Sequence, residues 1–430
     1  MTPGARVAAA IEVVEEIEAR KRPAADALRD WGLSHRFAGS KDRAAIASLV
    51  FDAQRKRASS AFIMGGETPR ASVLGALRQV RDMSAGALAA LCSGEGHSPP
   101  PLNEGEAERL LAGDLTGAPN FVAGDFPAWL EPSLAAVFGP AVVAEMSALA
   151  ARAPVDLRVN TLKSTREKVL ANLAHLRPAP TPYSPSGLRL PPAPDGRGPA
   201  LAAEPAYLKG LAEIQDEGSQ LAAILALAKP GEQVLDLCAG AGGKTLALAA
   251  SMQNKGQIHA TDRDGARLLR SIARLERAGV HNVQLHPPRG KNNGLGGLEG
   301  RCDLVFVDAP CTGTGTWRRN PDAKWRIRPG ALAIRIAEQD RALEEAARFV
   351  TPRGRILYAT CSVLREENED RLAAFLGSHG DYKSLPALEL AEMARMPGLG
   401  PFASRFGFGL RLTPLTSGTD AFFIAMLTRG

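Results

Sequence analysis

The chain has few cysteines for its length, and their spacing argues against two kinds of site. Its 430 residues include five cysteines and seven histidines. The number of cysteines is odd and no two form a CxxC pair, so a disulfide framework is not expected in a chain this long. No spacing of cysteine and histidine is typical of a zinc site. We therefore expect reduced thiols and no bound metal.

Long apolar runs are scarce as well. The chain begins MTPGARVAAAIEVVEEIEARKR, where acidic residues interrupt the apolar positions, so this segment is not expected to be a signal peptide. No later stretch of 18 apolar residues indicates a membrane span. The sequence thus predicts a cytoplasmic protein without membrane contact, and we expect a monomer.

The excess of positive charge is mild. Lysine and arginine number 52 against 46 acidic residues, which gives a net charge of +6 and a pI near 9.2. This balance favours a polyanionic partner such as nucleic acid, and a basic protein without such a partner is the alternative. With 45% hydrophobic residues, the chain is long enough to bury cores in two or three domains.

Three regions differ in their pattern and predict a multidomain protein. Residues 1–145 place apolar residues at helical spacing and predict an all-α bundle. Residues 146–205 combine the strand-like segments VDLRVNTL and SGLRLPP with a helix that Ser164 and Glu167 begin as a capping box, which predicts a small α/β subdomain. Residues 206–430 alternate strand and helix, which predicts a parallel sheet covered by helices on both faces and closed at one edge by a C-terminal hairpin.

The stretch CAGAGGKT, Cys238–Thr245, follows a predicted strand ending in Asp236 and precedes a predicted helix. A Walker A loop needs glycine at position 238, which is cysteine here. The next strand ends at Asp262, where a carboxylate can accept hydrogen bonds from ribose hydroxyls. Two carboxylates suit S-adenosylmethionine, which has a positive sulfonium and a ribose diol but no phosphate. A dinucleotide, a phosphate loop and a purely structural turn are the alternatives.

Two cysteines follow predicted strands at the same edge of the sheet. Cys311 lies in DAPCTGTG and Cys361 in YATCS, both at the carboxyl end of a strand. A thiolate that adds to carbon 6 of cytosine turns carbon 5 into a nucleophile for a sulfonium methyl. Asp308 is placed to neutralise the charge at ring nitrogen 3. Residue types alone do not say which thiol attacks, and a buried structural cysteine is the alternative for each.

Six segments together resemble the RNA cytosine-5 methyltransferases of the RsmB, Nop and Sun family. They are AEIQDEGSQLAA, VLDLCAGAGGKT, ATDRDGARL, FVDAPCTGTG, RRNPDAKW and YATCSVLREENE. The resemblance covers residues 205–430 and implies a class I, Rossmann-like methyltransferase sheet. LRVNTLK resembles the RRM-like subdomain of that family. GSKDRAAIASLVFDAQRKR resembles the NusB-like domain of the bacterial RsmB (Fmu/Sun) branch, whose members methylate 16S rRNA.

The resemblance implies a role for each site residue. It assigns Cys361 as the nucleophile, Cys311 as the thiol that assists release of the methylated RNA, and Asp308 as a residue that faces both the base and the cofactor. DNA cytosine methyltransferases attack with their Pro-Cys thiol, which would favour Cys311 instead. The implied cofactor is S-adenosyl-L-methionine and the implied partner is RNA, ribosomal RNA above all. The implied cofactor contacts are Cys238, Ala239, Gly240, Ala241, Gly242, Gly243, Lys244, Asp262 and Asp308.

Two departures from the family concern the cofactor. The family usually has Cys-Ala-Ala-Pro-Gly-Gly-Lys-Thr, whereas Gly240 and Ala241 replace the Ala-Pro pair here. After His286 the chain reads PPRGKNNGLGG, without the acidic turn that approaches the adenine in the family. We expect the loop to keep its function, and we assign no acidic adenine contact.

A basic segment after the Cys311 loop is expected to contact RNA. WRRNPDAKWRIR, Trp317–Arg328, combines basic and aromatic residues, which suits phosphate contact and base stacking. A solvated loop with its tryptophans in the core is the alternative. A target cytosine must be single-stranded or flipped out to reach the site. The predicted RNA contacts are Arg318, Arg319, Lys324, Arg158 and Asn160.

Two rival functions stay open at this point. One is a related methyltransferase that acts on tRNA or on another rRNA site. The other is an RNA-binding assembly factor whose methyltransferase domain has lost activity, against which the intact Cys361, Cys311 and Asp308 argue.

Overall fold

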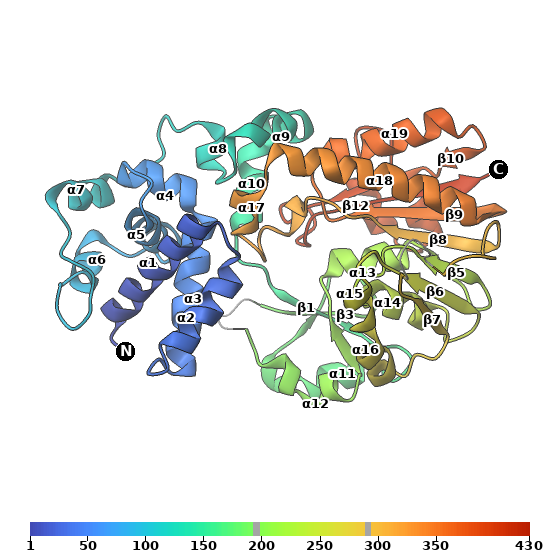
Figure 1. Cartoon of the computed structure of the whole chain (residues 1–430), viewed down its shortest axis with the longest axis horizontal. Helices are drawn as coiled ribbons and strands as arrows, with labels where there is room; N and C mark the ends of the chain where they lie inside the picture. The colour runs from blue at the N-terminus through green and yellow to red at the C-terminus, as the bar shows by residue number, and fades with distance from the viewer. Residues whose placement is uncertain (192–197, 289–293) are drawn as a thin grey trace. The chain divides into compact units, whose positions relative to one another are not determined.

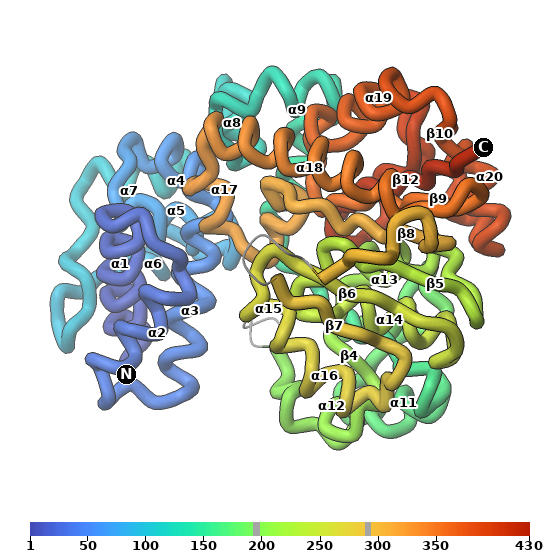
Figure 2. Tube along the Cα trace, turned by 45° about the vertical axis from the view of Figure 1, so that its right-hand side comes forward, coloured from blue at the N-terminus to red at the C-terminus, as the bar shows by residue number. Residues whose placement is uncertain are grey.

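The computed structural model describes residues 1–191, 198–288 and 294–430 (Figures 1 and 2). The chain forms two compact units. The helical unit contains Met1–Ala153 and Trp317–Arg328, and the sheet unit contains Pro154–Pro191, Pro199–Thr316 and Pro329–Gly430. The predicted boundaries at residues 145 and 205 stay predictions.

The N-terminal region is helical, as its apolar spacing predicts. Helix α1 begins after Thr2, whose hydroxyl accepts a hydrogen bond from the Ala5 N–H at 3.2 Å, and Pro3 occupies its first position. Apolar side chains of α1, α3 and α5 share one core with Leu88. The helices of this unit are α1 (Pro3–Arg20), α2 (Ala24–Ser34), α3 (Ser40–Arg55), α4 (Arg57–Met64), α5 (Pro69–Val80), α6 (Ala85–Leu91), α7 (Glu104–Ala112), α8 (Asn120–Ala123), α9 (Glu131–Phe138), α10 (Val142–Ala150) and α17 (Ala323–Arg326).

One helical stretch corrects the expectation that no long apolar span occurs. Ala128–Ala150, which includes α9 and α10, contains an 18-residue window with a mean hydropathy of 1.6. By length and composition alone it could cross a membrane. A single such stretch is weak evidence, because the core helices of soluble proteins pass the same test, and Leu134 and Met146 are buried within the chain.

The basic segment Trp317–Arg328 belongs to the helical unit rather than to the sheet unit from which it extends. The helical hydrogen bonding is interrupted between α3 and α4, and two carbonyl oxygens there accept from this segment. Trp325 Nε1 donates to the oxygen of Gln54 at 2.7 Å, and Lys324 Nζ donates to that of Arg55 at 2.8 Å. The segment is therefore fixed by its own side chains.

A small antiparallel sheet opens the sheet unit. Its elements follow the order strand, helix, two strands, helix, strand, and the strands lie in the order β2-β3-β1-β4, which is a ferredoxin-like arrangement. The predicted capping box is wrong by one residue, because Thr165 caps the helix and accepts from the Lys168 N–H at 3.4 Å. The elements are β1 (Val155–Val159), α11 (Arg166–Asn172), β2 (Ala179–Pro180), β3 (Gly187–Leu190), α12 (Pro205–Leu208) and β4 (Ala212–Ile214).

The main sheet contains parallel strands in the order β9-β8-β5-β6-β7. Beyond β9 it is extended by β12, antiparallel to β9, and then by β10, antiparallel to β12; β11 also pairs with β12. The C-terminal hairpin was expected to close the sheet edge, but β12 lies between β9 and β10, which the sequence patterns missed. The strands are β5 (Gln233–Asp236), β6 (Gln257–Thr261), β7 (Val283–His286), β8 (Cys302–Asp308), β9 (Val350–Thr360), β10 (Tyr382–Ser384), β11 (Leu410–Leu412) and β12 (Phe422–Arg429).

Helices cover both faces of this sheet, as predicted. Alternating strand residues such as Phe306 and Val307 pack into two different cores. One core includes α13, α14 and α20, and the other includes α18 and α19. Helix α14 also lies beside α16 and β6 (Figures 1 and 2). The helices are α13 (Glu217–Ile224), α14 (Gly243–Ser251), α15 (Gly265–Leu269), α16 (Ser271–Ala278), α18 (Pro329–Phe349), α19 (Glu369–Ser378) and α20 (Ala387–Met393).

Candidate active site

The candidate site lies at the carboxyl ends of the parallel strands, where the strand order reverses. The chain runs from β5 outward through β6 and β7, and then returns to the other side of β5 with β8. Open α/β sheets bind ligands at such a reversal. Asp236 ends β5, Asp308 ends β8, Asp262 follows β6 and Cys361 follows β9. The topology therefore brings four separate sequence motifs to one edge.

The glycine loop after β5 has the backbone that its composition predicts. Gly240 has φ +56° and Gly242 has φ +81°, a left-handed conformation that favours glycine. A Cβ atom on Gly242 would lie 2.7 Å from the Cβ of Ser271, so the loop packs closely on α16. The carbonyl of Ala241 accepts from Arg274 Nη1 at 2.6 Å. Side chains of α16 thus contact the loop at Ala241 and Gly242 and fix its backbone.

Asp262 supports the glycine loop directly. Its Oδ2 accepts from the Gly240 N–H at 2.7 Å, and its Oδ1 accepts from the Asp264 N–H at 2.8 Å. A carboxylate oxygen can accept two hydrogen bonds. Asp262 can therefore hold the loop and still accept from a ribose hydroxyl.

Lys244 and Asp308 form an ion pair between the loop and β8. Lys244 Nζ donates to Asp308 Oδ2 at 2.7 Å. Burial alone would lower the pKa of Lys244, but the Asp308 carboxylate outweighs it and raises that pKa. Lys244 therefore keeps its proton in this pair, and the second carboxyl oxygen of Asp308 stays available to a ligand.

Two titratable groups lie at the start of the loop, the buried Asp236 and the half-buried Cys238. Asp236 is fully buried, and burial raises its pKa to about 7, although Thr245 Oγ1 donates to its Oδ2 at 2.7 Å. Burial, reinforced by the carboxylates of Asp308 and Asp236, raises the pKa of the Cys238 thiol well above its usual range. Cys238 is therefore a neutral thiol and no nucleophile.

The two expected thiols lie together. Cys311 Sγ and Cys361 Sγ are 3.4 Å apart. Gly315 permits this approach, because its N–H donates to the Cys361 oxygen at 2.9 Å and an added Cβ would lie 2.8 Å from that oxygen. The hydrogen bond to Cys361, followed by burial, raises the pKa of Cys311 well above its usual range. Cys311 is thus held as a thiol.

A pocket of about 560 Å³ joins the thiols to the cofactor loop. Of the predicted residues, Cys238, Asp262, Asp308, Cys311 and Cys361 line it. Sequence reasoning missed several lining residues, because nothing in their local spacing marks them, and α18 contributes two of them. The missed residues are Arg263, Asp264, Arg267, Ala309, Pro310, Arg335 and Glu338.

The structure corrects the RNA-contact prediction for two residues of the small sheet. Arg158 and Asn160 are 5% and 4% exposed. Arg158 Nε donates to Gln215 Oε1 at 2.6 Å, and burial lowers the pKa of Arg158 to about 10. Asn160 Nδ2 donates to the carbonyls of Gly210 and Ala278 at 2.9 and 2.8 Å. Both side chains are internal and present no surface to a phosphate.

Two residues of the basic segment are corrected in the same way. Lys324 is 1% exposed and Arg318 is 4% exposed. Lys324 is bound to the Arg55 carbonyl, and Arg55 Nη1 donates to the Arg318 carbonyl at 2.5 Å. Arg319 is half-buried, and its RNA contact stays a prediction. Arg326 and Arg328 are the exposed basic side chains of the segment.

The residues of the pocket fit S-adenosylmethionine. Asp262 has free acceptor capacity for the ribose diol. Four carboxylates (Asp262, Asp264, Asp308 and Glu338) line the pocket with three guanidinium groups (Arg263, Arg267 and Arg335), so the lining has a small excess of the negative charge that a sulfonium favours. The predicted absence of an acidic adenine contact concerns residues 287–297, of which 289–293 lie outside the described residues, and it stays a prediction. Among residues 1–191, 198–288 and 294–430, no group of three or more His, Cys, Asp or Glu side chains could hold a metal.

The reversed strand order, the glycine loop and the acidic pocket define a Rossmann-like methyltransferase sheet. Two family descriptions match this chain: "16S rRNA methyltransferase RsmB/F" over residues 222–428, and the RsmF/B-like ferredoxin-like domain over residues 126–195. The chain belongs to the RsmB/F methyltransferase family. The cofactor of this family is S-adenosylmethionine, as predicted from the loop.

Curated relatives carry the same family name. A probable ribosomal RNA small subunit methyltransferase B from Synechocystis sp. is 33% identical over 61% of this chain and 58% of its own length. A ribosomal RNA small subunit methyltransferase B from Sodalis glossinidius is 33% identical over 70% of this chain and 65% of its own length. The matches thus span less than two thirds of these relatives.

Solved structures share the fold. The crystal structure of PH0851 has a TM-score of 0.72 at 26% identity, and the match covers 99% of both chains. A methyltransferase homolog protein from Pyrococcus horikoshii has a TM-score of 0.58 at 28% identity, covering 72% of this chain and 98% of that one.

Proposed function

We propose that this protein transfers a methyl group from S-adenosylmethionine to carbon 5 of a cytosine in RNA, and that its substrate is 16S rRNA. The observation that carries the proposal is the pair of thiols, 3.4 Å apart, in the pocket that also contains Asp262 and Asp308. Methyl transfer to an oxygen or to an exocyclic nitrogen has no need of a thiol. A carbon with little nucleophilicity needs one.

The protein residues divide the chemistry between them. The Cys361 thiolate forms a bond to carbon 6, and the electron pair of the 5,6 double bond moves toward ring nitrogen 3. Asp308 is proposed to hold ring nitrogen 3, and the proton that neutralises the charge there comes from the Lys244–Asp308 pair. The cofactor, when bound, supplies the electrophilic methyl that carbon 5 takes. Solvent water at the open pocket is proposed to take the carbon 5 proton; its electron pair then re-forms the 5,6 double bond, and the sulfur leaves carbon 6 as the Cys361 thiolate.

Cys311 is proposed to assist that last step. Its raised pKa keeps it protonated, so it is a poor competitor for the attack and can return a proton while the adduct breaks. This division supports Cys361 as the nucleophile. The thiol that attacks in DNA cytosine methyltransferases occupies the Cys311 position, and it is the alternative that the variants below distinguish.

The remaining regions are proposed to bind the RNA. The helical unit is proposed to be a NusB-like domain, because it is entirely helical in the part that the structure describes and Arg326 and Arg328 are exposed on it. The small sheet is proposed to be an RRM-like subdomain, which its ferredoxin-like order supports. A protein that modifies rRNA works in the cytoplasm.

Mapping of 5-methylcytosine in ribosomal RNA and tRNA, with and without the gene, tests the proposal. We expect one cytosine of 16S rRNA to lose its methyl group when the gene is removed, and to regain it with the wild-type gene but not with Cys361→Ser. Loss of a tRNA methyl group instead would change the substrate. An unchanged map would refute the activity and favour an assembly factor.

A further inference from the structure

Glu367 is a buried carboxylate close to both thiols that the mechanism above does not use. It ends the short turn η6 (Arg365–Glu367), six residues after Cys361, and its exposure is 0%. A carboxylate buried in this way is strongly destabilising unless its oxygens are hydrogen-bonded. The identity of its donors therefore shows what the residue does.

Four donors occupy the two oxygens of Glu367. Oε1 accepts from the Thr312 N–H at 2.8 Å and from Gln339 Nε2 at 3.0 Å. Oε2 accepts from the hydroxyls of Thr312 and Ser362, both at 2.5 Å. An ionised carboxylate has about four such acceptor positions. Burial raises the pKa of Glu367, and these hydrogen bonds counteract that rise by favouring the ionised form.

The donors are the immediate neighbours of the two cysteines. Thr312 follows Cys311, and Ser362 follows Cys361. Gln339 Nε2 also donates to the carbonyl of Pro310, on the other side of Cys311, at 2.9 Å. One carboxylate therefore connects the residues that flank the first thiol with the residue that follows the second.

A second layer fixes Glu367 itself. The hydroxyl of Tyr358, within β9, donates to the Glu367 carbonyl at 2.6 Å. The Ser362 hydroxyl lies 3.1 Å from that of Thr314, which accepts from the Val363 N–H at 2.9 Å. The carboxylate is therefore anchored to the main sheet as well as to the two loops.

We propose that Glu367 is a positioning residue that sets the separation of Cys311 and Cys361 and, by its negative charge, keeps Cys311 protonated while Cys361 attacks. The inference rests on the proposed function, because it assigns the two thiols different tasks. The hydrogen bond with Cys361 contributes most to the raised pKa of Cys311, followed by burial, and the charges of Cys361 and Glu367 raise it further. A merely structural Glu367 would affect folding but not the difference in reactivity between the thiols.

The Glu367→Gln variant tests this difference at nearly constant volume. Its side chain has one acceptor oxygen, which can keep the bond from the Thr312 N–H, and its NH2 group would then face the hydroxyls of Thr312 and Ser362, which must reverse their hydrogen bonds. The Asp370→Asn variant is the matched control, because Asp370 is a carboxylate three residues on that pairs with Arg365 at the surface. Alkylation of each cysteine by iodoacetamide, followed by peptide mass spectrometry at one mildly alkaline pH, gives two separate rates.

We expect Cys311 in Glu367→Gln to be alkylated about tenfold faster, since loss of one nearby charge shifts a pKa by about one unit. The value of kcat should fall by about tenfold or more, while KM for S-adenosylmethionine stays unchanged, because the four donors to the Glu367 carboxylate all lie outside the cofactor loop. Asp370→Asn should match the wild type in all three measurements.

An unchanged Cys311 alkylation rate in a folded Glu367→Gln variant would overturn the proposal. If that variant does not fold, Thr312→Val decides, because it removes only the hydroxyl donor; we expect a smaller increase in the Cys311 rate, and no increase overturns the proposal. Wild-type protein that makes no 5-methylcytosine would refute the proposed function instead, and the alkylation rates would still test Glu367.

Discussion

The Sγ atoms of Cys311 and Cys361 are in contact at 3.4 Å, so no base can lie between them. Both thiols must face the same part of a bound pyrimidine and act on it in succession. The sequence places each cysteine after a strand, but only the pairing of β8 with β9 makes them neighbours. The sequence motifs therefore identify the two reactive sulfur atoms, and the strand pairing sets the distance between them.

A covalent trap distinguishes the two thiols. Cys311→Ala should accumulate a protein–RNA adduct, because the attack by Cys361 is intact and the release step is slowed. A denaturing gel with labelled RNA and S-adenosylmethionine measures the adduct. The double variant Cys311→Ala with Cys361→Ser is the control and should show no band. Adduct formation in Cys361→Ser alone would reverse the assignment.

Asp262 offers a second prediction for a single residue. Asp262→Ala removes an acceptor for ribose and leaves the Gly240 and Asp264 N–H groups without theirs. Binding of S-adenosylmethionine should weaken by about 1–3 kcal/mol, the cost of unsatisfied hydrogen bonds. Titration calorimetry measures the change. Asp370→Asn should bind normally, and normal binding by Asp262→Ala would remove Asp262 from the cofactor site.

At the scale of elements, the segment around α17 shows how far composition can mislead. Its basic and aromatic side chains predict a surface for RNA, yet Trp325 and Lys324 satisfy carbonyls at the interruption between α3 and α4. A charged ammonium group is buried there only because it reaches a backbone acceptor. Local sequence cannot reveal this, because the acceptors are some 270 positions earlier in the chain.

Lys324 gives the helical unit a pH dependence with a definite sign. Burial lowers its pKa from 10.5 to about 7. Between about pH 7 and 10.5 the unfolded chain keeps this proton while the folded chain releases it, so this contribution to stability increases as the pH rises. Below about pH 7 both states are charged, and the folded state bears the full cost of burial.

Lys324→Met should remove that increase, which is on the order of a few kcal/mol. Urea unfolding gives the free energy of unfolding of wild type and variant at both ends of this pH window. Subtracting the variant from the wild type at each pH removes the contributions of the other titrating groups, which the two proteins share. Lys255→Met is the control, because Lys255 is exposed. An equal pH dependence in Lys324→Met and wild type would contradict the assignment.

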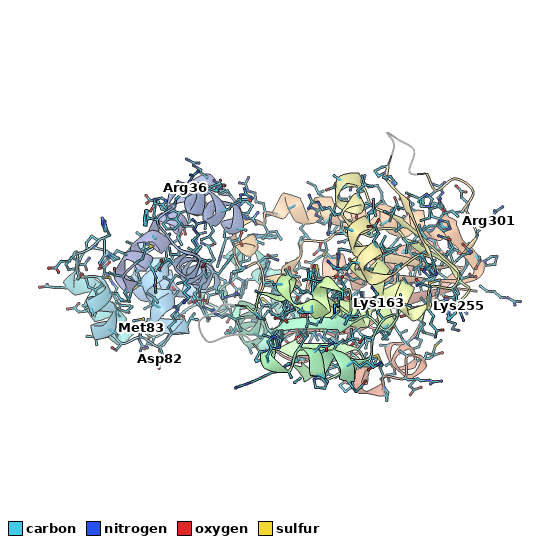
Figure 3. The ribbon with its side chains drawn as sticks, turned by 90° about the horizontal axis from the view of Figure 1, so that it is seen from below. Arg36, Asp82, Met83, Lys163, Lys255 and Arg301 are labelled. Carbon is cyan, nitrogen blue, oxygen red and sulfur yellow. The ribbon has the colours of Figure 1, made fainter. Side chains whose placement is uncertain are left out.

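At the scale of the whole molecule, the net charge of +6 is small, so the position of the exposed charges matters more than their sum. Lys255 and Arg301 precede β6 and β8 and lie at the amino ends of the strands, opposite to the edge with the thiols (Figure 3). Arg326 and Arg328 belong to the segment that follows the Cys311 loop. The pair Lys255 and Arg301 and the pair Arg326 and Arg328 thus have the same charge but lie on different segments of the chain.

RNA affinity should decrease with salt, and the two pairs of basic residues should contribute unequally. Changing Arg326 and Arg328 to Gln should reduce the slope of log affinity against log salt by about one for each phosphate that the protein no longer neutralises. Changing Lys255 and Arg301 to Gln should leave the slope unchanged. Filter binding over a series of salt concentrations measures both, and equal slopes in the two double variants would place the RNA elsewhere.

The sequence by itself determined the parallel strands β5, β6, β8 and β9 of the main sheet, the helices that cover it and the motifs at its carboxyl edge. Strand length, helical spacing and glycine position are local properties, and residues directly after parallel strands necessarily meet at one edge. It also indicated the family, since Cys238–Lys244, Cys311 and Cys361 lie within distinctive motifs.

Only the tertiary structure decided which polar and charged groups are buried. Arg158, Asn160 and Lys324 were expected at the surface and are internal, while Glu367 had no predicted role and contacts the neighbours of both thiols. Burial depends on partners that are distant in the chain, and the cost of desolvation depends on whether those partners donate or accept. Residue type and spacing carry neither piece of information.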